Sequence, residues 1–315
     1  MNIALDMMGG DFAPLETVKG AAAFLQSAKQ DIHLTLIGDE EQIRTHLIEY
    51  PIPENRFTIV PSTQVIGMHE HPTRALKEKP ESSIAIGFKL LAAGNTEAFI
   101  SAGNTGAMMV GALFSIKTIE GVLRPTIGAY MPREDGTLGL LVDVGLNADC
   151  KPENLNQFAT LGSLYAKHIL NFENPSVGLV NLGEEEGKGN LLAQAAYPLL
   201  KENKFINFIG NVEGRDLLDT KSDVFVCDGF TGNVILKMAE SIYDIARRRN
   251  INDEHFNRFN FEQYGGVPVL GVSRPVIIGH GISHATAFSN MIRIAQRMLE
   301  TDLMGKIKDS FTTEG

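Results

Sequence analysis

Short apolar runs recur along the whole chain, and most of them end in Gly, Asn or Asp. Runs of this length that lead into turn-forming residues are typical of buried strands. We therefore predict strands at Ile3–Leu5, Leu34–Ile37, Ala98–Ile100, Leu138–Val142, Val177–Leu182, Phe205–Ile209, Val224–Val226 and Pro275–Ile278.

Between many of these runs, the apolar residues follow the spacing of one face of a helix. The helical windows are Leu15–Ala28, Ser83–Ala93, Thr105–Lys117, Glu153–Asn171, Leu191–Lys201, Val234–Arg249 and Ala285–Leu299. Strands that alternate with helices in this way predict an α/β fold built on a mainly parallel sheet.

The interval from Ile127 to Val142 departs from this alternation, because two apolar runs flank the turn-forming stretch Pro132–Gly136. This pattern predicts a local antiparallel hairpin. No repeat, low-complexity tract or linker marks a domain boundary, so we expect a single unit over residues 1–315, with two lobes as the alternative. Residues 309–315 are predicted to form a loose polar tail.

Composition narrows the class of protein. A chain of 315 residues with 43% hydrophobic content can bury a substantial core. Its net charge of −10, with no block of five like charges, argues against nucleic-acid binding, which needs clustered Lys and Arg. The two cysteines lie outside any CxxC pair, which suits a reducing cytosol. The chain has no apolar segment long enough for a membrane span and no basic leader before an apolar stretch, so we predict neither export nor a membrane span.

Five loop segments follow predicted strands, which is where parallel α/β sheets bind ligands. They are Asp6–Asp11, Ser101–Gly106, Asp143–Asn147, Asn181–Asn190 and Asp228–Asn233. Five polar, glycine-containing segments exceed what turns alone require. They are our candidates for the residues that carry chemistry.

Two of these segments, SAGNTG at Ser101–Gly106 and DGFTGN at Asp228–Asn233, place Gly on both sides of a Thr at a helix start. Such loops can present several N–H groups to a phosphate. The alternative is that Asn104 or Thr105 only caps a helix. Lys188 lies between two glycines and could reach an anion, and its alternative is a solvated surface lysine.

Several familiar signatures are missing from the chain. It contains no Walker pattern, no GxGxxG after the first strand, no GxSxG and no HExxH, and its histidines show no recognised metal spacing. We expect no metal and no cofactor. His280 follows a predicted strand and suits a general acid or oxyanion donor, although a structural loop histidine is an equal alternative.

The segments together resemble the bacterial phosphate acyltransferase family, PlsX, almost from end to end. The motifs that carry the resemblance are ALDMMGGDFAP (Ala4–Pro14), HPTRALKEKPESS (His71–Ser83), FISAGNTGAMM (Phe99–Met109), LLVDVGLNADCKPE (Leu140–Glu153), NLGEEEGKGN (Asn181–Asn190), INFIGNVEGRD (Ile206–Asp216), DGFTGNVILK (Asp228–Lys237) and YGGVPVLG (Tyr264–Gly271). The resemblance implies a three-layer α/β/α fold like those of isocitrate and isopropylmalate dehydrogenases and of phosphotransacetylases.

The resemblance also implies a reaction, in which acyl-[acyl-carrier-protein] and inorganic phosphate give acyl phosphate and free carrier protein for phospholipid synthesis. Phosphate is already a nucleophile near neutral pH, so positioning and oxyanion stabilisation should dominate. On this basis we assign Gly103, Asn104, Thr105, Gly106 and Lys188 to phosphate, and Asn104, Lys188 and His280 to catalysis. The predicted substrate-binding residues are Asp143, Asn147, Asn181, Asn211, Asp228, Thr231 and Asn233.

Partners follow from the same resemblance. Acyl carrier proteins are acidic, so Arg247, Arg248 and Arg249 are predicted to dock one against this acidic chain. The resemblance further implies a cytoplasmic homodimer and a membrane glycerol-3-phosphate acyltransferase as a partner. Contact with the membrane surface through Phe256, Phe259 and Phe261 is a weaker implication, because the segment between Tyr243 and Tyr264 is short, and a packed helix end is its alternative.

Two other functions stay open from sequence. One is a metal- and NAD-dependent decarboxylating dehydrogenase of related fold, which would need an acidic metal site and substrate-facing arginines. The other is a non-catalytic scaffold for a membrane acyltransferase, for which intact anion-binding loops would be superfluous.

Overall fold

A computed structural model describes residues 1–28 and 31–312, which form two compact units. The first unit contains Met1–Thr118 and Glu262–Met304, and the second contains Ile119–Phe261 and the chain from Gly305 onwards. The chain has no linker-like composition where it passes from one unit to the other, so the sequence pattern shows no domain boundary. That both act together as one phosphate acyltransferase unit stays a prediction.

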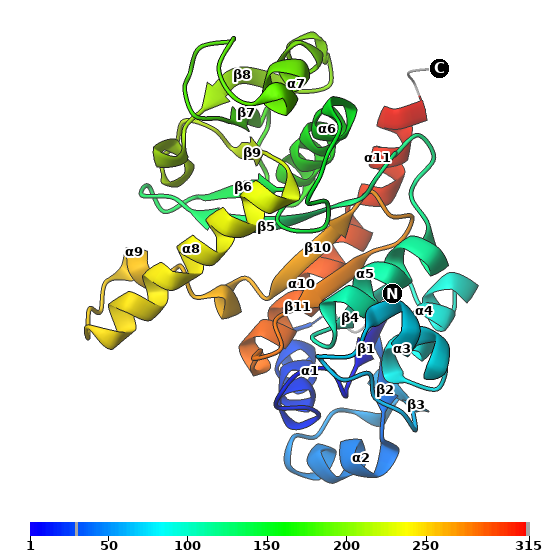
Figure 1. The fold of residues 1–315 in the computed structure, drawn as a ribbon. Helices are drawn as coiled ribbons and strands as arrows, with labels where there is room; N and C mark the ends of the chain where they lie inside the picture. The colour runs from blue at the N-terminus through cyan, green and yellow to red at the C-terminus, as the bar shows by residue number, and fades with distance from the viewer. Residues whose placement is uncertain (29–30, 313–315) are drawn as a thin grey trace. The chain divides into compact units, whose positions relative to one another are not determined.

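The first unit is built on a mainly parallel sheet (Figure 1). Its strands lie in the order β3-β2-β1-β4-β11-β10, and only β10 runs antiparallel to its neighbour β11. Their bounds are β1 Asn2–Asp6, β2 His33–Gly38, β3 Phe57–Pro61, β4 Ala98–Ser101, β10 Gly266–Leu270 and β11 Val276–Gly279. The predicted mainly parallel α/β class is confirmed here.

Helices cover both faces of this sheet, with α1 and α10 on one side of β1 and β4 and α4 on the other (Figure 1). The helices are α1 Leu15–Ser27, α2 Glu40–Glu49, α3 Pro72–Glu78, α4 Ser83–Ala93, α5 Thr105–Gly111 with a π-helical continuation Ala112–Ile116, and α10 Ala285–Glu300. Helices α1 and α10 approach closely at Gly20, where a Cβ atom would lie 2.4 Å from the Cβ of Phe288. A larger residue there would overpack the contact.

The sheet strands of the second unit lie in the order β5-β6-β9-β7-β8. The strands are β5 Thr126–Pro132, β6 Leu138–Val142, β7 Ser176–Val180, β8 Asn207–Val212 and β9 Val224–Val226. β5 and β6 pair antiparallel, which confirms the predicted hairpin, and the other neighbours are parallel.

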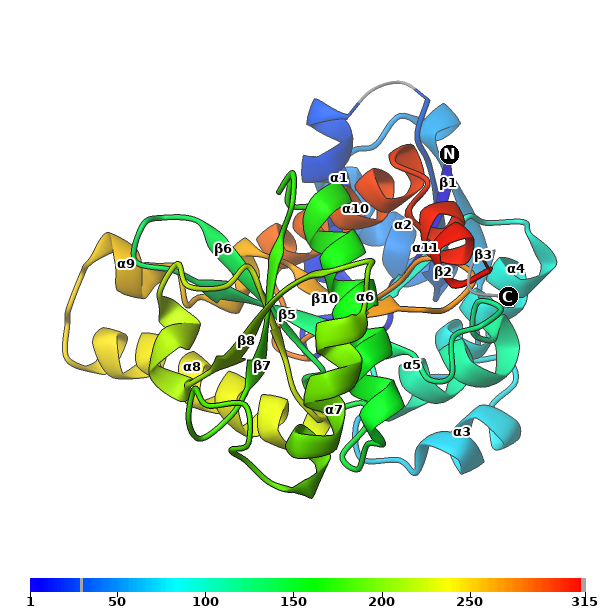
Figure 2. The ribbon, with the colours of Figure 1, turned by 90° about the horizontal axis from the view of Figure 1, so that it is seen from above.

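Helices also cover both faces of the second sheet, with α6 and α7 on one face and α8 on the other (Figure 2). Their bounds are α6 Pro152–His168, α7 Leu191–Glu202 and α8 Gly229–Arg248, followed by the short α9 Glu254–Asn257. Each of the three long helices starts where a loop leaves a strand. The same end of the sheet therefore carries strand exits and helix N-termini.

The structure corrects two sequence expectations. The loose tail predicted at residues 309–315 is wrong for residues 309–312, because α11 Leu303–Thr312 buries Leu303 and Ile307 and continues through them, while residues 313–315 lie outside the described part. The apolar pattern also missed β3 and β10. Within residues 1–28 and 31–312, no helix combines the length and apolarity needed to cross a bilayer.

Candidate active site

In the first unit, three loops leave the carboxyl ends of the neighbouring parallel strands β1, β4 and β11. Parallel strands end at the same edge of a sheet, so these loops lie together. The loops after β1 and β11 are joined directly, since the N–H of Asp11 donates to the carbonyl of Gly281 at 2.7 Å. The SAGNTG loop, Ser101–Gly106, follows β4.

A buried carboxylate ties the β1 loop to the SAGNTG loop. Asp6 is 1% exposed, and its Oδ2 accepts the Ser101 hydroxyl at 2.6 Å. The Ser101 Oγ in turn accepts the N–H of Gly103 at 2.9 Å. Burial raises the pKa of Asp6 above its usual value of 3.8, although the hydrogen bond from Ser101 works against this shift. This chain of contacts fixes the backbone at the start of the SAGNTG loop.

Asn104 holds the other end of the same loop. Its Oδ1 accepts the N–H of Ala107 at 2.9 Å, which caps α5. Its Nδ2 lies within hydrogen-bond distance of the carbonyls of Gly67, Met68 and Glu70, at 2.9, 3.2 and 3.0 Å. The side chain is 4% exposed and its polar atoms are engaged, so in this structure Asn104 positions two loops.

Backbone donors lie at the start of the helix that follows this loop. First-turn N–H groups of a helix have no acceptor within it. Thr105 is exposed and Gly106 is half-buried. A Cβ atom on Gly106 would lie 2.3 Å from the Pro72 ring, so glycine is required for the close packing of α3 against this turn.

In the second unit, the parallel strands β6, β9, β7 and β8 bring four polar loops to one edge. The loop after β6 is organised by Asp143, which is fully buried. Its Oδ1 accepts the N–H groups of Ile127 and Leu146 at 3.2 and 3.3 Å. Its Oδ2 accepts the backbone and side-chain N–H groups of Asn147 at 2.6 and 2.8 Å.

Helix α8 packs tightly on this loop. The Nδ2 of Asn233 donates to the carbonyl of Val144 at 3.1 Å. A Cβ atom on Gly232 would lie 1.8 Å from the carbonyl oxygen of Asp143, and one on Gly229 would lie 2.7 Å from that of Asn147. Glycine at both positions therefore brings the first turn of α8 into contact with the loop.

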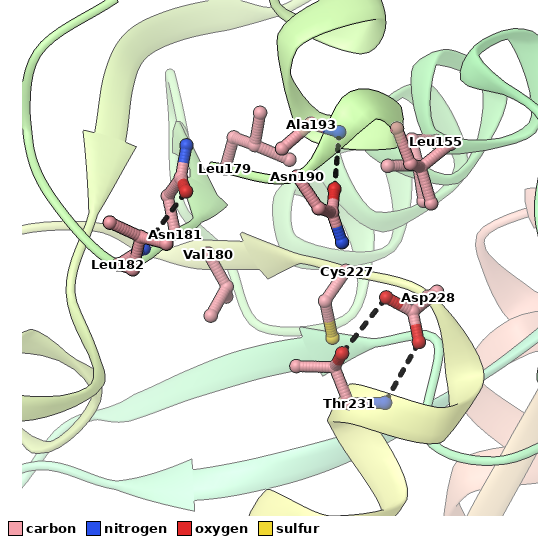
Figure 3. Close-up of a pocket in the computed structure, with 11 residues that line it drawn as sticks. Leu155, Leu179, Val180, Asn181, Leu182, Asn190, Ala193, Cys227, Asp228 and Thr231 are labelled. Carbon is pink, nitrogen blue, oxygen red and sulfur yellow. Dashed lines mark hydrogen bonds between the residues drawn. The ribbon is translucent and has the colours of Figure 1, made fainter. Parts of the chain in front are cut away.

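A cavity of about 280 Å³ opens at the same edge (Figure 3). Asn181, Asp228 and Thr231, all predicted to bind substrate, line it together with Asn190. Asp228 caps α8, since its carboxylate accepts the Thr231 N–H at 2.8 Å and the Thr231 hydroxyl at 2.9 Å. The structure thus brings three separately predicted residues to one hollow.

The loop Asn181–Asn190 is held by amides. The Nδ2 of Asn181 donates to the carbonyl of Lys188 at 3.1 Å, and that of Asn211 donates to the carbonyl of Glu185 at 2.9 Å. The Oδ1 of Asn211 is buried without a hydrogen-bond partner among the described residues. The Lys188 side chain is half-exposed, and its ammonium lies 3.9 Å from a carboxylate oxygen of Glu185.

Comparison with known proteins identifies the family. The family model described as "Fatty acid synthesis protein" matches residues 1–306. A phosphate acyltransferase of Halothermothrix orenii is 43% identical, with both chains covered in full. One from Dictyoglomus turgidum is 43% identical over 98% of this chain and 96% of its own. The chain belongs to this family. The resemblance predicted from the motifs is confirmed.

Solved structures support the fold assignment independently of sequence. A phosphotransacetylase from Streptococcus pyogenes superimposes with a TM-score of 0.65 at 17% identity, over 95% of this chain and 94% of its own. A branched-chain phosphotransacylase from Enterococcus faecalis gives a TM-score of 0.62 at 15% identity, over 95% and 99%. The predicted kinship with phosphotransacetylases in fold is confirmed.

The remaining predicted residues of this family member are His280 and the arginines 247–249. His280 is half-buried directly after β11. Arg247, Arg248 and Arg249 are all exposed at the end of α8, where the Arg247 guanidinium lies 5.7 Å from the Tyr243 ring centre. Their predicted roles in catalysis and docking stay predictions.

Sequence reasoning did not single out Asp6 or Ser101 as individual residues. Asp6 is the last residue of the apolar strand β1, Asp143 directly follows β6, and Asp228 lies two residues after β9. An acidic residue at three strand exits was a usable signal. Its partner Ser101 was not accessible from local sequence, because the two residues are 95 positions apart.

We predict a pH-dependent stability difference between the protein and its Asp6→Asn variant. A raised folded-state pKa favours the protonated carboxyl, so its stabilising contribution is complete below 3.8 and is lost as pH rises through the folded value. The neutral amide lacks this dependence. Urea unfolding should therefore show wild type losing stability relative to Asp6→Asn as pH rises above 3.8. A difference that stays constant over this range would contradict the assignment.

Proposed function

We infer that this protein is a phosphate acyltransferase that converts acyl-[acyl-carrier-protein] and inorganic phosphate into acyl phosphate in phospholipid synthesis. The observation that carries this conclusion is the full-length identity of 43% with a relative named phosphate acyltransferase. The same relationship favours a transferase over a decarboxylating dehydrogenase or a scaffold. A phosphate oxygen forms the new bond to the acyl carbon, and the carbon–sulfur bond breaks to release the carrier thiol.

The chemistry needs positioning more than a protein nucleophile. A thiol has a pKa of about 8.5 and leaves with little help from an acid. Phosphate supplies the attacking oxygen. What the protein must add is a fixed cradle of donors for phosphate and for the oxyanion that forms at the carbonyl. Loops held by buried hydrogen bonds, as at Asp6 and Asp143, suit this task because they need little reorganisation.

Phosphate is assigned to the Gly103–Gly106 segment and Lys188. The exposed helix start at Thr105 and the close packing of Gly106 on Pro72 support backbone binding there. Asn104 was predicted to be catalytic. Because its side chain is hydrogen-bonded to the protein, we assign it the role of positioning the loop. Lys188 is supported by its half-exposed side chain, whose ammonium lies 3.9 Å from a carboxylate oxygen of Glu185.

The other site residues are assigned to the acyl-thioester substrate. Asn181, Asp228 and Thr231 are supported by the cavity that they share. The other residues assigned to this substrate organise the neighbouring loops of the second unit: Asp143, Asn147, Asn211 and Asn233. His280, half-buried at a strand exit in the first unit, is the proposed general acid or oxyanion donor.

The carrier protein is assigned to the exposed arginines 247–249 at the end of α8. A local positive surface offsets the repulsion between an acidic carrier and a protein of net charge −10. A membrane surface is less well supported, because Phe259 is only 6% exposed and packs edge-to-face on His255. The packed helix end is therefore favoured over an interfacial patch.

Assembly and location are further parts of the proposal. A homodimer is supported by the exposed apolar residues Phe230, Val234 and Met238, which recur every four positions along α8. Sedimentation equilibrium measures this state directly. Free cysteines support the cytoplasm as the site of action, and an acyl phosphate product fits a membrane glycerol-3-phosphate acyltransferase as the next enzyme. The likeness in fold to isocitrate and isopropylmalate dehydrogenases also stays a proposal.

Purified protein incubated with acyl carrier substrate and labelled phosphate is expected to form a hydroxylamine-sensitive acyl phosphate and free carrier thiol. The Lys188→Ala variant should lose about a hundredfold in kcat/KM for phosphate, because a cation that meets the phosphate charge is removed. Carrier binding should change far less.

Lys201→Ala is the matched control, since Lys201 is an exposed lysine of the same unit that is paired with Glu186 at 3.0 Å. It should keep wild-type kinetics. No acyl phosphate from wild type with any acyl length would refute the function. Full activity of Lys188→Ala would refute only the assignment of that lysine.

Reversing the charges of arginines 247–249 to glutamate should raise the apparent KM for acyl carrier protein and flatten its dependence on salt. Acyl-coenzyme A surrogates, which lack the acidic protein surface, should be affected much less. Initial rates over a series of salt concentrations measure both effects. Identical salt dependence in variant and wild type would place the docking surface elsewhere.

A further inference from the structure

The cavity of the second unit is lined mostly by apolar residues. Among the residues that line it are Leu155 from α6, Leu179 from β7, and Leu192 and Ala193 from α7 (Figure 3). The thiol of Cys227 completes this wall, and burial raises its pKa well above 9.0, so it stays protonated and uncharged. A volume of about 280 Å³ bounded in this way suits a flexible apolar group.

The charges at this cavity argue against phosphate as its occupant. Of the described residues that line it, none is Lys or Arg. Its only charged lining residue, Asp228, carries a carboxylate that would repel an anion. The polar atoms of Thr231 are also committed, since its hydroxyl donates to Asp228 at 2.9 Å.

Asn190 offers a polar donor for a neutral acceptor. The Oδ1 of Asn190 accepts the N–H of Ala193 at 2.8 Å and caps α7. This contact requires the oxygen on that side, so the Nδ2 is the free end of the amide, and Figure 3 shows it on the side of Cys227 in the cavity wall. An N–H donor beside an apolar hollow matches a carbonyl group at the end of an alkyl chain.

We propose that this cavity binds the acyl chain of the thioester substrate, with Asn190 Nδ2 donating to the acyl carbonyl. The proposal rests on the proposed function, since it names where that substrate is held. The apolar wall then determines which chain lengths are accepted. Each methylene that enters the cavity should raise kcat/KM about fourfold, and methylenes beyond its end should add little.

A filling substitution tests the wall. Ala193→Leu adds bulk where Ala193 lines the cavity, and Ala195→Leu adds the same bulk at an exposed position of the same helix that does not line it. With acyl carrier substrates from hexanoyl to hexadecanoyl, Ala193→Leu should lose at least about tenfold in kcat/KM for the longest chains and keep its activity on the shortest. Ala195→Leu should match wild type at every length.

A conservative substitution tests the donor. Asn190→Asp keeps an N-cap acceptor for α7 and removes the amide donor. It should lose at least about tenfold in kcat/KM at every chain length, with a thermal midpoint within about 2 °C of wild type. Unchanged kinetics would overturn the carbonyl contact.

Binding measured without turnover separates this proposal from the proposed function. Titration calorimetry with a hexadecyl thioether of coenzyme A, which cannot transfer an acyl group, should show at least about tenfold weaker binding to Ala193→Leu than to Ala195→Leu. Equal affinities, together with an unchanged chain-length profile, would overturn the cavity assignment even if wild type makes acyl phosphate. Failure of wild type to make acyl phosphate would instead count against the function.

Discussion

Buried carboxylates at strand exits are the constraint on which the rest of this structure depends. Asp6 in the first unit and Asp143 in the second are almost inaccessible to solvent, and each accepts hydrogen bonds from the loop that follows its strand. A buried carboxyl group is tolerated only where hydrogen-bond partners surround it. These hydrogen bonds hold the loops, so donors at the proposed site would need little reorganisation when a ligand binds.

This arrangement explains how the protein could act without a covalent intermediate. Neither cysteine is prepared to attack a thioester, because burial raises the pKa of Cys150 to about 11, with the carboxylate of Asp143 adding to the effect, and that of Cys227 is also raised. Ser101 is buried, and its hydroxyl is bonded to Asp6. Phosphate itself is the nucleophile in this account, and the protein contributes geometry and donors.

Much of the fold was predictable because helices and parallel strands leave local patterns. The helix at Ser83–Ala93 was placed at its observed bounds, since Ser82 caps it and Gly94, with a φ of 77°, ends it. Strand β10 was not predicted, because it is short, flanked by glycine and contains Pro268, a pattern that is typical of a loop. Helix α2 was not predicted, because Ile43 is its one buried residue and its apolar pattern is therefore weak.

For the candidate site, the sequence allowed us to predict which loops follow strands but not which side chains meet. Most strand exits were located to within two residues, although β8 ends three residues after the predicted strand, and three of the predicted residues share one cavity. The contact of Asp6 with Ser101, and the cavity that Leu155 and Thr231 share, bring together residues far apart in the chain, and local sequence carries no signal for either. The same holds for Asn104, whose sequence context suggested a ligand while its side chain tethers the segment Gly67–Glu70.

The central claim, transfer to phosphate without a protein nucleophile, is tested most directly by the intact mass of the protein after incubation with acyl carrier substrate in the absence of phosphate. The account predicts an unchanged protein mass and no release of carrier thiol until phosphate is added. A protein heavier by one acyl group, with carrier thiol released in equal amount, would contradict it.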